Sequence, residues 1–117
     1  MIPSNLEPYL IPVLLIAFFS WRLLKFRKVK SGLSALLEQG AIIVDVRSRG
    51  EFMSGARNGS INMPLDELDK SSARLNTEKP IVLCCASGTR SAMAATLLKR
   101  KGFKNVINAG PWKNTIL

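Results

Sequence analysis

The sequence contains no histidine, and only two of its 117 residues are cysteines. Without histidine, the chain cannot use Ser-His-Asp or Cys-His catalysis, a His-ligated zinc ion or an imidazole pH switch. The cysteines, Cys84 and Cys85, are adjacent, so they cannot cross-link a small secreted fold or supply the four ligands of a zinc site. Three classes of protein remain possible: a small basic enzyme, a binding module, or either of these with a membrane anchor.

Acidic residues are also scarce, because 8 Asp and Glu oppose 17 Lys and Arg and give a formal net charge of +9. Five of the cations fall within residues 22–30, whereas residues 31–117 carry 12 basic and 7 acidic residues, a net charge of +5. No basic patch is interleaved with aromatic residues, so no nucleic-acid partner is expected. A hydrophobic content of 47% is too high for a disordered polycation, and the length suits one small domain with a short appendage.

The first 30 residues differ from the rest, since residues 9–21 are apolar apart from Ser20. A helix over residues 8–26, which Pro12 should bend early, would be about 28 Å long and close to the hydrocarbon thickness of a bilayer. The cations follow the apolar run. The positive-inside rule then predicts a single-pass anchor in a lipid membrane, with the N-terminus outside and the rest in the cytoplasm, as in a bacterial inner membrane.

Two other interpretations of this segment are a cleaved signal peptide and a soluble helix packed on the domain. A signal peptide carries its positive charges before the apolar run and a small-residue cleavage site after it, whereas here Arg22 and further cations follow the run. We therefore predict a retained anchor with a basic juxtamembrane segment over residues 1–30 and a separate domain over residues 31–117. Residues 29–34 are expected to form a short polar connection between them.

Residues 31–117 predict an α/β domain with a mostly parallel central sheet flanked by helices. Continuous apolar runs are typical of buried parallel strands, and Ser48 and Glu51 have the spacing of a capping box that opens a short helix. The expected strands are residues 41–46, 60–63, 81–84 and 104–108. The other expected helices are the segment with Leu33, Leu36 and Leu37 up to a stop at Gly40, and residues 65–75 and 91–101.

The polar segment that follows residues 81–84 is the strongest candidate for a functional site. Ligands of parallel sheets bind beyond the carboxyl ends of the strands, and here Cys85 lies between a strand and a helix. The helix dipole and the backbone N–H groups of the loop favour an anion, Gly88 allows a positive φ, and Arg90 adds a positive charge. These features should lower the pKa of Cys85 and favour its thiolate. Cys84 continues the apolar strand and is expected in the core.

The loop Cys85-Ala86-Ser87-Gly88-Thr89-Arg90-Ser91 resembles the active-site loop of single-domain rhodaneses, which have a cysteine, four residues, an arginine and often a serine. Further segments resemble motifs of this family in the same order; they are residues 43–47, 51–55, 59–65 and 109–112. The chain departs from the family at Ala56-Arg57, where His-Ile is usual. Its C-terminus is short, so the usual closing helix is expected to be missing or reduced.

The resemblance implies a rhodanese-like sulfurtransferase. Cys85 would attack the outer sulfur of thiosulfate or a similar anionic donor, form a persulfide, and pass the sulfur to a thiol, cyanide or protein acceptor without metal or cofactor. Cys85 and Arg90 are then the catalytic residues. The substrate-binding residues would be Ala86, Ser87, Gly88, Thr89 and Ser91. Asp45 and Arg47 are expected to support the loop from the neighbouring strand, or to form only a structural ion pair there.

The doubled cysteine allows other hypotheses. Counted from Cys84, five residues precede Arg90, which is the spacing of tyrosine phosphatases and of the rhodanese-like phosphatases and arsenate reductases. A phosphatase would benefit from a general acid, for which Asp66 and Asp69 are candidates. A second alternative is a non-catalytic rhodanese-fold module that recruits partners to the membrane and does not need Cys85. Finally, Cys84 could resolve a persulfide or sulfenate formed on Cys85.

Overall fold

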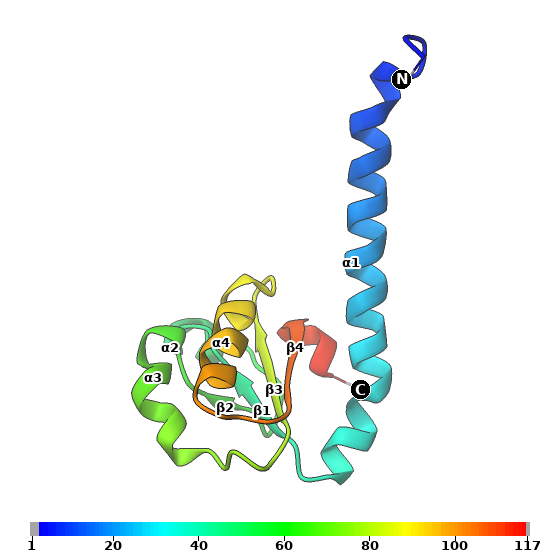
Figure 1. The fold of residues 1–117 in the computed structure, drawn as a ribbon. Helices are drawn as coiled ribbons and strands as arrows, with labels where there is room; N and C mark the ends of the chain where they lie inside the picture. Colours follow the sequence, from blue (N-terminus) through cyan, green and yellow to red (C-terminus); the bar gives the residue numbers. More distant parts are fainter. Residues whose placement is uncertain (1–2, 117) are drawn as a thin grey trace.

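Four parallel strands form the centre of the fold (Figure 1), which confirms the predicted α/β class with a mostly parallel sheet. The computed structural model describes residues 3–116, apart from the side chains of residues 26 and 28–31. The strands are β1 (Ile42–Asp45), β2 (Ile61–Asn62), β3 (Ile81–Cys85) and β4 (Val106–Pro111), in the order β2-β1-β3-β4. All five residues of β3 are buried, as expected for a central parallel strand that is covered on both faces.

Short helices connect the strands. They are α2 (Arg49–Ser54), α3 (Leu68–Ser71) and α4 (Thr89–Arg100), with 3₁₀ turns η1 (Leu65–Glu67), η2 (Ser72–Arg74) and η3 (Trp112–Thr115). The predicted capping box is present, because Ser48 and Glu51 exchange hydrogen bonds at the start of α2. The single helix expected over residues 65–75 is instead divided into η1, α3 and η2, in a segment rich in Asp and Ser, which have low helix propensity.

The N-terminal helix α1 (Glu7–Glu38) is longer than predicted. The polar connection expected at residues 29–34 is wrong, because the helix passes through it and ends only before Gly40, whose φ is 85°. The reason is packing: Leu33 is 1% exposed, and Leu36 and Leu37 pack beside it on the sheet. The predicted boundary between residues 30 and 31 lies inside this helix, and the division into anchor and domain stays a prediction.

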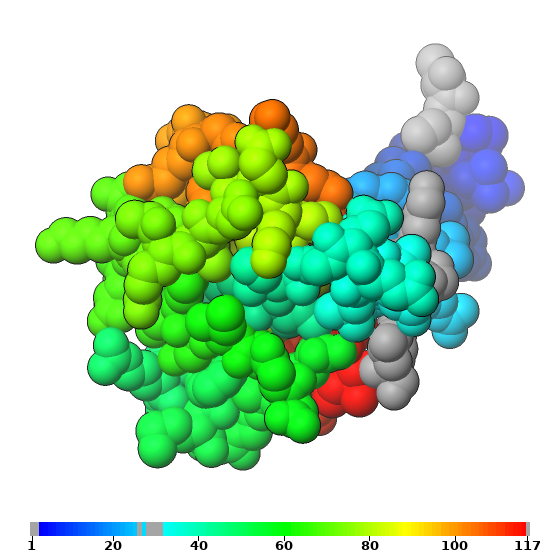
Figure 2. All heavy atoms as spheres, turned by 90° about the horizontal axis from the view of Figure 1, so that it is seen from below, coloured from blue at the N-terminus to red at the C-terminus, as the bar shows by residue number. Residues whose placement is uncertain are grey.

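The remainder of α1 contacts the domain near Arg22 and then extends away from it (Figure 1). Residues Glu7–Lys25 are long and apolar enough to cross a membrane by length and composition, and none of this segment is buried inside the protein. Pro12 lies within the helix. The predicted juxtamembrane cations Lys28 and Lys30 lie outside the described side chains. Figure 1 shows α1 extending far beyond the domain, whereas Figure 2 shows its last turns, in cyan, against the body of the domain.

The sheet separates two apolar clusters. On one face, Val44, Leu83 and Cys85 pack against residues of α3 and α4. On the other face, Ile43, Val82 and Cys84 pack against the end of α1. This alternation follows from the two-residue period of a strand, and it places the two cysteines on opposite faces.

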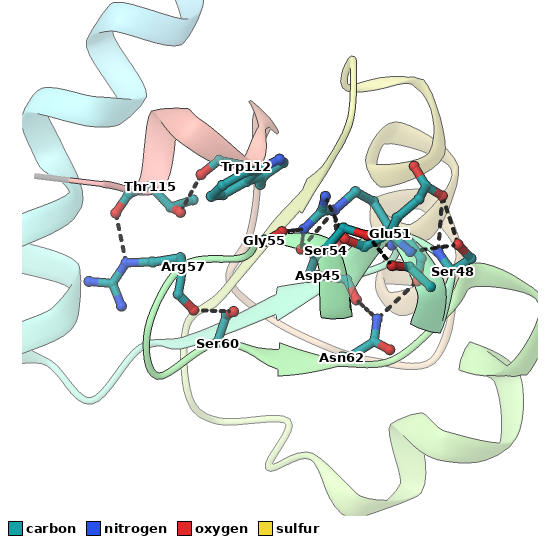
Figure 3. A network of polar contacts seen from close by, with 12 residues as sticks. Asp45, Ser48, Glu51, Ser54, Gly55, Arg57, Ser60, Asn62, Trp112 and Thr115 are labelled. Carbon is teal, nitrogen blue, oxygen red and sulfur yellow. Dashed lines mark hydrogen bonds and ion pairs between the residues drawn. The ribbon is translucent and has the colours of Figure 1, made fainter.

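The short C-terminal segment is fixed by a residue outside the predicted site. Arg57 Nε donates a hydrogen bond to the Thr115 carbonyl oxygen at 2.7 Å, and Thr115 is buried (Figure 3). The closing helix that was expected to be missing or reduced is the 3₁₀ turn η3. Arg57 therefore ties the loop before β2 to the end of the chain.

The packing of α1 on the sheet predicts a stability difference between two leucines of this helix. We expect Leu33→Ala to lower the free energy of unfolding by about 2–5 kcal/mol, because it opens a cavity in the core. Leu24→Ala, at a leucine that is 62% exposed, should change it by less than about 0.5 kcal/mol. Urea unfolding of the full chain in detergent, followed by tryptophan fluorescence, measures both. Equal effects of the two substitutions would show that the end of α1 does not belong to the core.

Candidate functional site

The site is built where β3 ends and α4 begins. Only Ala86, Ser87 and Gly88 separate these two elements, so the chain turns sharply around the side chain of Cys85. Gly88 is the N-cap of α4 and has a φ of 102°, a left-handed conformation that favours glycine. In this conformation the Gly88 N–H donates a hydrogen bond to Cys85 Sγ at 2.9 Å. The loop thus surrounds a buried sulfur atom with backbone donors.

The environment of Cys85 favours its thiolate. Burial raises the pKa of this thiol, but hydrogen bonds from the Ser91 side chain and from the backbone N–H groups of Ser91, Gly88 and Ser87 lower it further than burial raises it. The net result is a pKa below the ordinary value of a cysteine. The positive end of the α4 dipole acts in the same direction. A lower thiol pKa increases the fraction of thiolate, the nucleophilic form of cysteine.

Cys84 has the opposite character. It is fully buried on the face of the sheet that α1 covers, and burial, followed by the nearby Asp45 charge, raises its pKa to about 12. This thiol stays protonated and packs on the face of the sheet opposite to that of Cys85. The geometry therefore disfavours Cys84 as the nucleophile of a phosphatase and as a partner that resolves an intermediate on Cys85.

Asn108 belongs to the site and was not predicted from the sequence. Its Oδ1 lies 2.6 Å from Ser91 Oγ and accepts the Gly110 N–H at 2.9 Å, while its Nδ2 donates to the Gly88 carbonyl oxygen at 3.2 Å. Ser91 Oγ in turn lies 3.4 Å from Cys85 Sγ. The register shift between β3 and β4 occurs beside Asn108, where Leu83 pairs with Asn108 but Cys84 pairs with Gly110. The bulge brings this amide to the loop.

Arg90 lies at the edge of the site rather than against the thiol. Its guanidinium forms a bidentate ion pair with Glu51, with N–O distances of 2.7 and 2.9 Å. This pairing and the hydrogen bonds from Ser48 lower the pKa of Glu51 to about 2, so the carboxylate stays charged at any physiological pH. Arg90 also lines a cavity of about 410 Å³ with Ser48, Leu65 and other residues. The cavity gives a small ligand room beside a cation.

The candidate general acids differ in position. Asp66 lines the same cavity as Arg90. Asp69 instead forms an ion pair with Lys101 at 2.7 Å and does not line this cavity. Of the two, only Asp66 is brought to the site. In the part of the chain that the structure describes, no group of three His, Cys, Asp or Glu side chains could hold a metal ion.

Asp45 and Arg47 form a buried ion pair at the end of β1, with an Nη2–Oδ2 distance of 2.7 Å. Arg47 also donates to the Gly55 carbonyl oxygen at 2.7 Å and lies 4.9 Å from the centroid of the Trp112 ring. Figure 3 shows Asp45, Gly55 and Trp112 gathered at this point. The pair therefore joins β1, the end of α2 and the C-terminal segment, and none of the hydrogen bonds described for it involves Cys85.

The other residues of the loop form its rim. Ala86, Ser87 and Thr89 are exposed, and the hydroxyl oxygens of Ser87 and Thr89 lie 3.5 Å apart. The structure thus brings Cys85, Gly88 and Ser91 together at the sulfur atom and places Arg90 at the edge. Two contacts of the site were not predicted: the Glu51 partner of Arg90 and the Asn108 partner of Ser91. Glu51 was recognised only as a capping residue.

Comparison with known proteins agrees with the resemblance of the motifs. Residues 30–110 match the family model of the rhodanese-like domain. The chain is 42% identical over 69 residues to YrkF of Bacillus subtilis, covering 59% of this chain but only 37% of YrkF. It is 36% identical over 72 residues to the thiosulfate sulfurtransferase GlpE of Pseudomonas savastanoi, covering 62% and 68% of the two chains. The structure of human single-domain sulfurtransferase TSTD1 superimposes with a TM-score of 0.64 at 29% identity, covering 72% and 88%.

The hydrogen bond from Ser91 predicts a change in the pH dependence of Cys85. Because this bond lowers the pKa of the thiol, Ser91→Ala should raise the pKa, reduce the thiolate fraction at pH 7 and slow alkylation by iodoacetamide. The measurement is the alkylation rate against pH, followed by intact mass. The control is Ser54→Ala, at an exposed serine that bonds only to the Gly50 carbonyl oxygen among its described contacts. An unchanged midpoint in Ser91→Ala would contradict the assignment.

The burial of Arg47 predicts a large cost for removing its partner. We expect Asp45→Asn to lower the free energy of unfolding by about 3–5 kcal/mol, because it leaves the guanidinium buried without its counter-charge. The comparison is Glu78→Gln, which breaks the exposed Lys104–Glu78 pair and should cost less than about 1 kcal/mol. Urea unfolding measures both, and similar losses for the two variants would disprove a special role for the buried pair.

Proposed function

Because the chain belongs to the family of rhodanese-like domains, we propose that it is a sulfurtransferase that carries sulfane sulfur as a persulfide on Cys85. Relatives with the names of sulfurtransferases support the class of activity. The observation that carries the proposal for this chain is the sulfur atom of Cys85 inside a ring of hydrogen-bond donors, with the Gly88 N–H at 2.9 Å. This arrangement stabilises negative charge on one sulfur atom.

In the first half of the reaction, the Cys85 thiolate attacks the outer sulfur of an anionic donor. With thiosulfate, a bond forms between Cys85 Sγ and that sulfur, the S–S bond of thiosulfate breaks, and sulfite leaves with its electron pair. The N–H groups of the loop stabilise the persulfide that results. Arg90 attracts the anionic donor at the cavity that it lines. The donor sulfur would bind within the loop that surrounds Cys85, formed by Ala86, Ser87, Gly88, Thr89 and Ser91.

In the second half, a thiolate or cyanide attacks the outer sulfur of the persulfide. The bond to Cys85 Sγ breaks, Cys85 recovers its thiolate, and the acceptor leaves as a persulfide or as thiocyanate. The two halves balance without an oxidant, a reductant or a metal, and they predict ping-pong kinetics. Asp45 and Arg47 support the site indirectly, because their ion pair holds the end of β1 in place.

The alternatives have less support. A phosphatase that uses Cys84 would need a buried thiol with a pKa of about 12 as its nucleophile. A module that only recruits partners would need neither the lowered pKa of Cys85 nor the hydrogen bonds that lower it. The contacts around Cys85 are explained most directly by chemistry on its sulfur atom.

We further propose that Glu7–Lys25 anchors the enzyme in a membrane. The cations Arg22, Lys25 and Arg27 at and after the end of this segment support an orientation with the N-terminus outside and the domain in the cytoplasm. A reducing cytoplasm would keep both cysteines free.

The test is the intact mass of the full chain in detergent after incubation with thiosulfate. We expect a gain of about 32 Da, one sulfur atom, that cyanide removes with release of thiocyanate. Cys85→Ser should abolish the gain. Cys84→Ser, the matched control at the neighbouring thiol, should retain it. A folded wild-type chain that gains no sulfur from thiosulfate would refute thiosulfate as donor, and a gain that persists in Cys85→Ser would refute Cys85 as nucleophile.

A further inference from the structure

A second hollow lies on the other side of the catalytic loop, between this loop and α1. The two elements are in contact, since Arg22 Nη2 lies 2.5 Å from the Ser87 carbonyl oxygen and donates a hydrogen bond to it. A groove of about 440 Å³ opens beside this contact and is lined by Phe19, Arg22, Leu23, Ala86, Ser87 and Pro111. In Figure 1, α1 passes the domain on the side of β4.

The walls of this groove differ from those of the cavity beside Arg90. Phe19 and Leu23 are 60% and 54% exposed and offer apolar surface along α1. The groove is also lined by Ala86 and Ser87, the two residues that directly follow Cys85. Arg22 is the cation at the junction of the apolar wall and the loop. The groove therefore combines a hydrocarbon surface with a positive charge beside the residues that follow Cys85 in the loop.

An inorganic donor such as thiosulfate has no hydrocarbon part and gains nothing from Phe19 and Leu23. A molecule that uses both features has an anionic sulfur head and an apolar chain. It can come from the bilayer, because both residues lie near the end of Glu7–Lys25, the segment suited to cross a membrane. The head then meets the catalytic loop while the chain follows α1.

We propose that this groove binds the hydrocarbon chain of an amphiphilic thiol, which accepts the sulfane sulfur from Cys85. The inference rests on the proposed sulfurtransferase function and specifies its acceptor. The acceptor thiolate attacks the outer sulfur of the Cys85 persulfide, the bond to Cys85 Sγ breaks, and the product leaves as an alkyl persulfide. Cys85 recovers its thiolate, the proton of the acceptor thiol passes to water, and no further reactant is needed.

The experiment compares acceptors of different chain length. The full chain in phosphatidylcholine nanodiscs is loaded with thiosulfate, and the loss of the persulfide to ethanethiol or octanethiol is followed by intact mass. We expect octanethiol to react faster than ethanethiol with the wild type. In the double variant Phe19→Ala/Leu23→Ala, the ratio of the octanethiol rate to the ethanethiol rate should fall by at least about tenfold.

The matched control removes the effect of partitioning into the lipid. Leu15 lies on the same helix, is 51% exposed and does not line the groove, so Leu15→Ala should keep the wild-type ratio. A ratio that is unchanged in the double variant, or that falls equally in Leu15→Ala, would overturn the inference. These results would leave the proposed function intact, since the persulfide still forms. A chain that takes up no sulfur from thiosulfate would overturn the function and the inference together.

Discussion

The hydrogen bond from the Gly88 N–H to Cys85 Sγ is the contact on which the site depends. It requires β3 to end at Cys85 and α4 to begin at Thr89, and it requires the left-handed φ of 102° at Gly88. A residue with a Cβ would be strained in that conformation. The sulfur atom is fully buried, and burial alone would raise the pKa of Cys85. Hydrogen bonds from the Ser91 side chain and from the backbone N–H groups of the loop outweigh this effect and lower the pKa of Cys85.

The two adjacent cysteines show how strongly the direction of a side chain decides its chemistry. Both belong to β3 and both are fully buried. Cys85 points to the face that carries α4 and meets donors, whereas Cys84 points to the face that α1 covers and meets apolar side chains. Their pKa values consequently move in opposite directions. Cys84 was predicted in the core because it continues the apolar run of residues 81–83, a pattern that depends only on neighbouring residues.

Local patterns in the sequence predicted β1, β3, the capping box and α4, since each depends on residues that are close along the chain. The unpredicted contacts join distant residues: Glu51 and Arg90 are 39 positions apart, and Asn108 reaches Ser91 across 17 positions. The bulge that turns Asn108 towards the loop depends on the register of β4, which no local pattern fixes. The polar connection was predicted at residues 29–34 because their composition is polar. However, a polar segment can stay helical when tertiary packing holds the next turns of the helix. Here the buried side chain of Leu33 holds them in the core.

This continuity of α1 has a consequence for the site. Phe19, Arg22 and Leu23 precede Leu33, Leu36 and Leu37 by 14 positions each, which is close to four turns of a helix, so both groups lie on nearly the same face. One face of a single helix therefore packs on the sheet and, about 21 Å further along, lines a groove beside the loop that follows Cys85. A flexible connection at residues 29–34 would let these two functions move independently. An uninterrupted helix fixes the distance between the core and the loop, so the packing of Leu33 also determines where Arg22 meets Ser87.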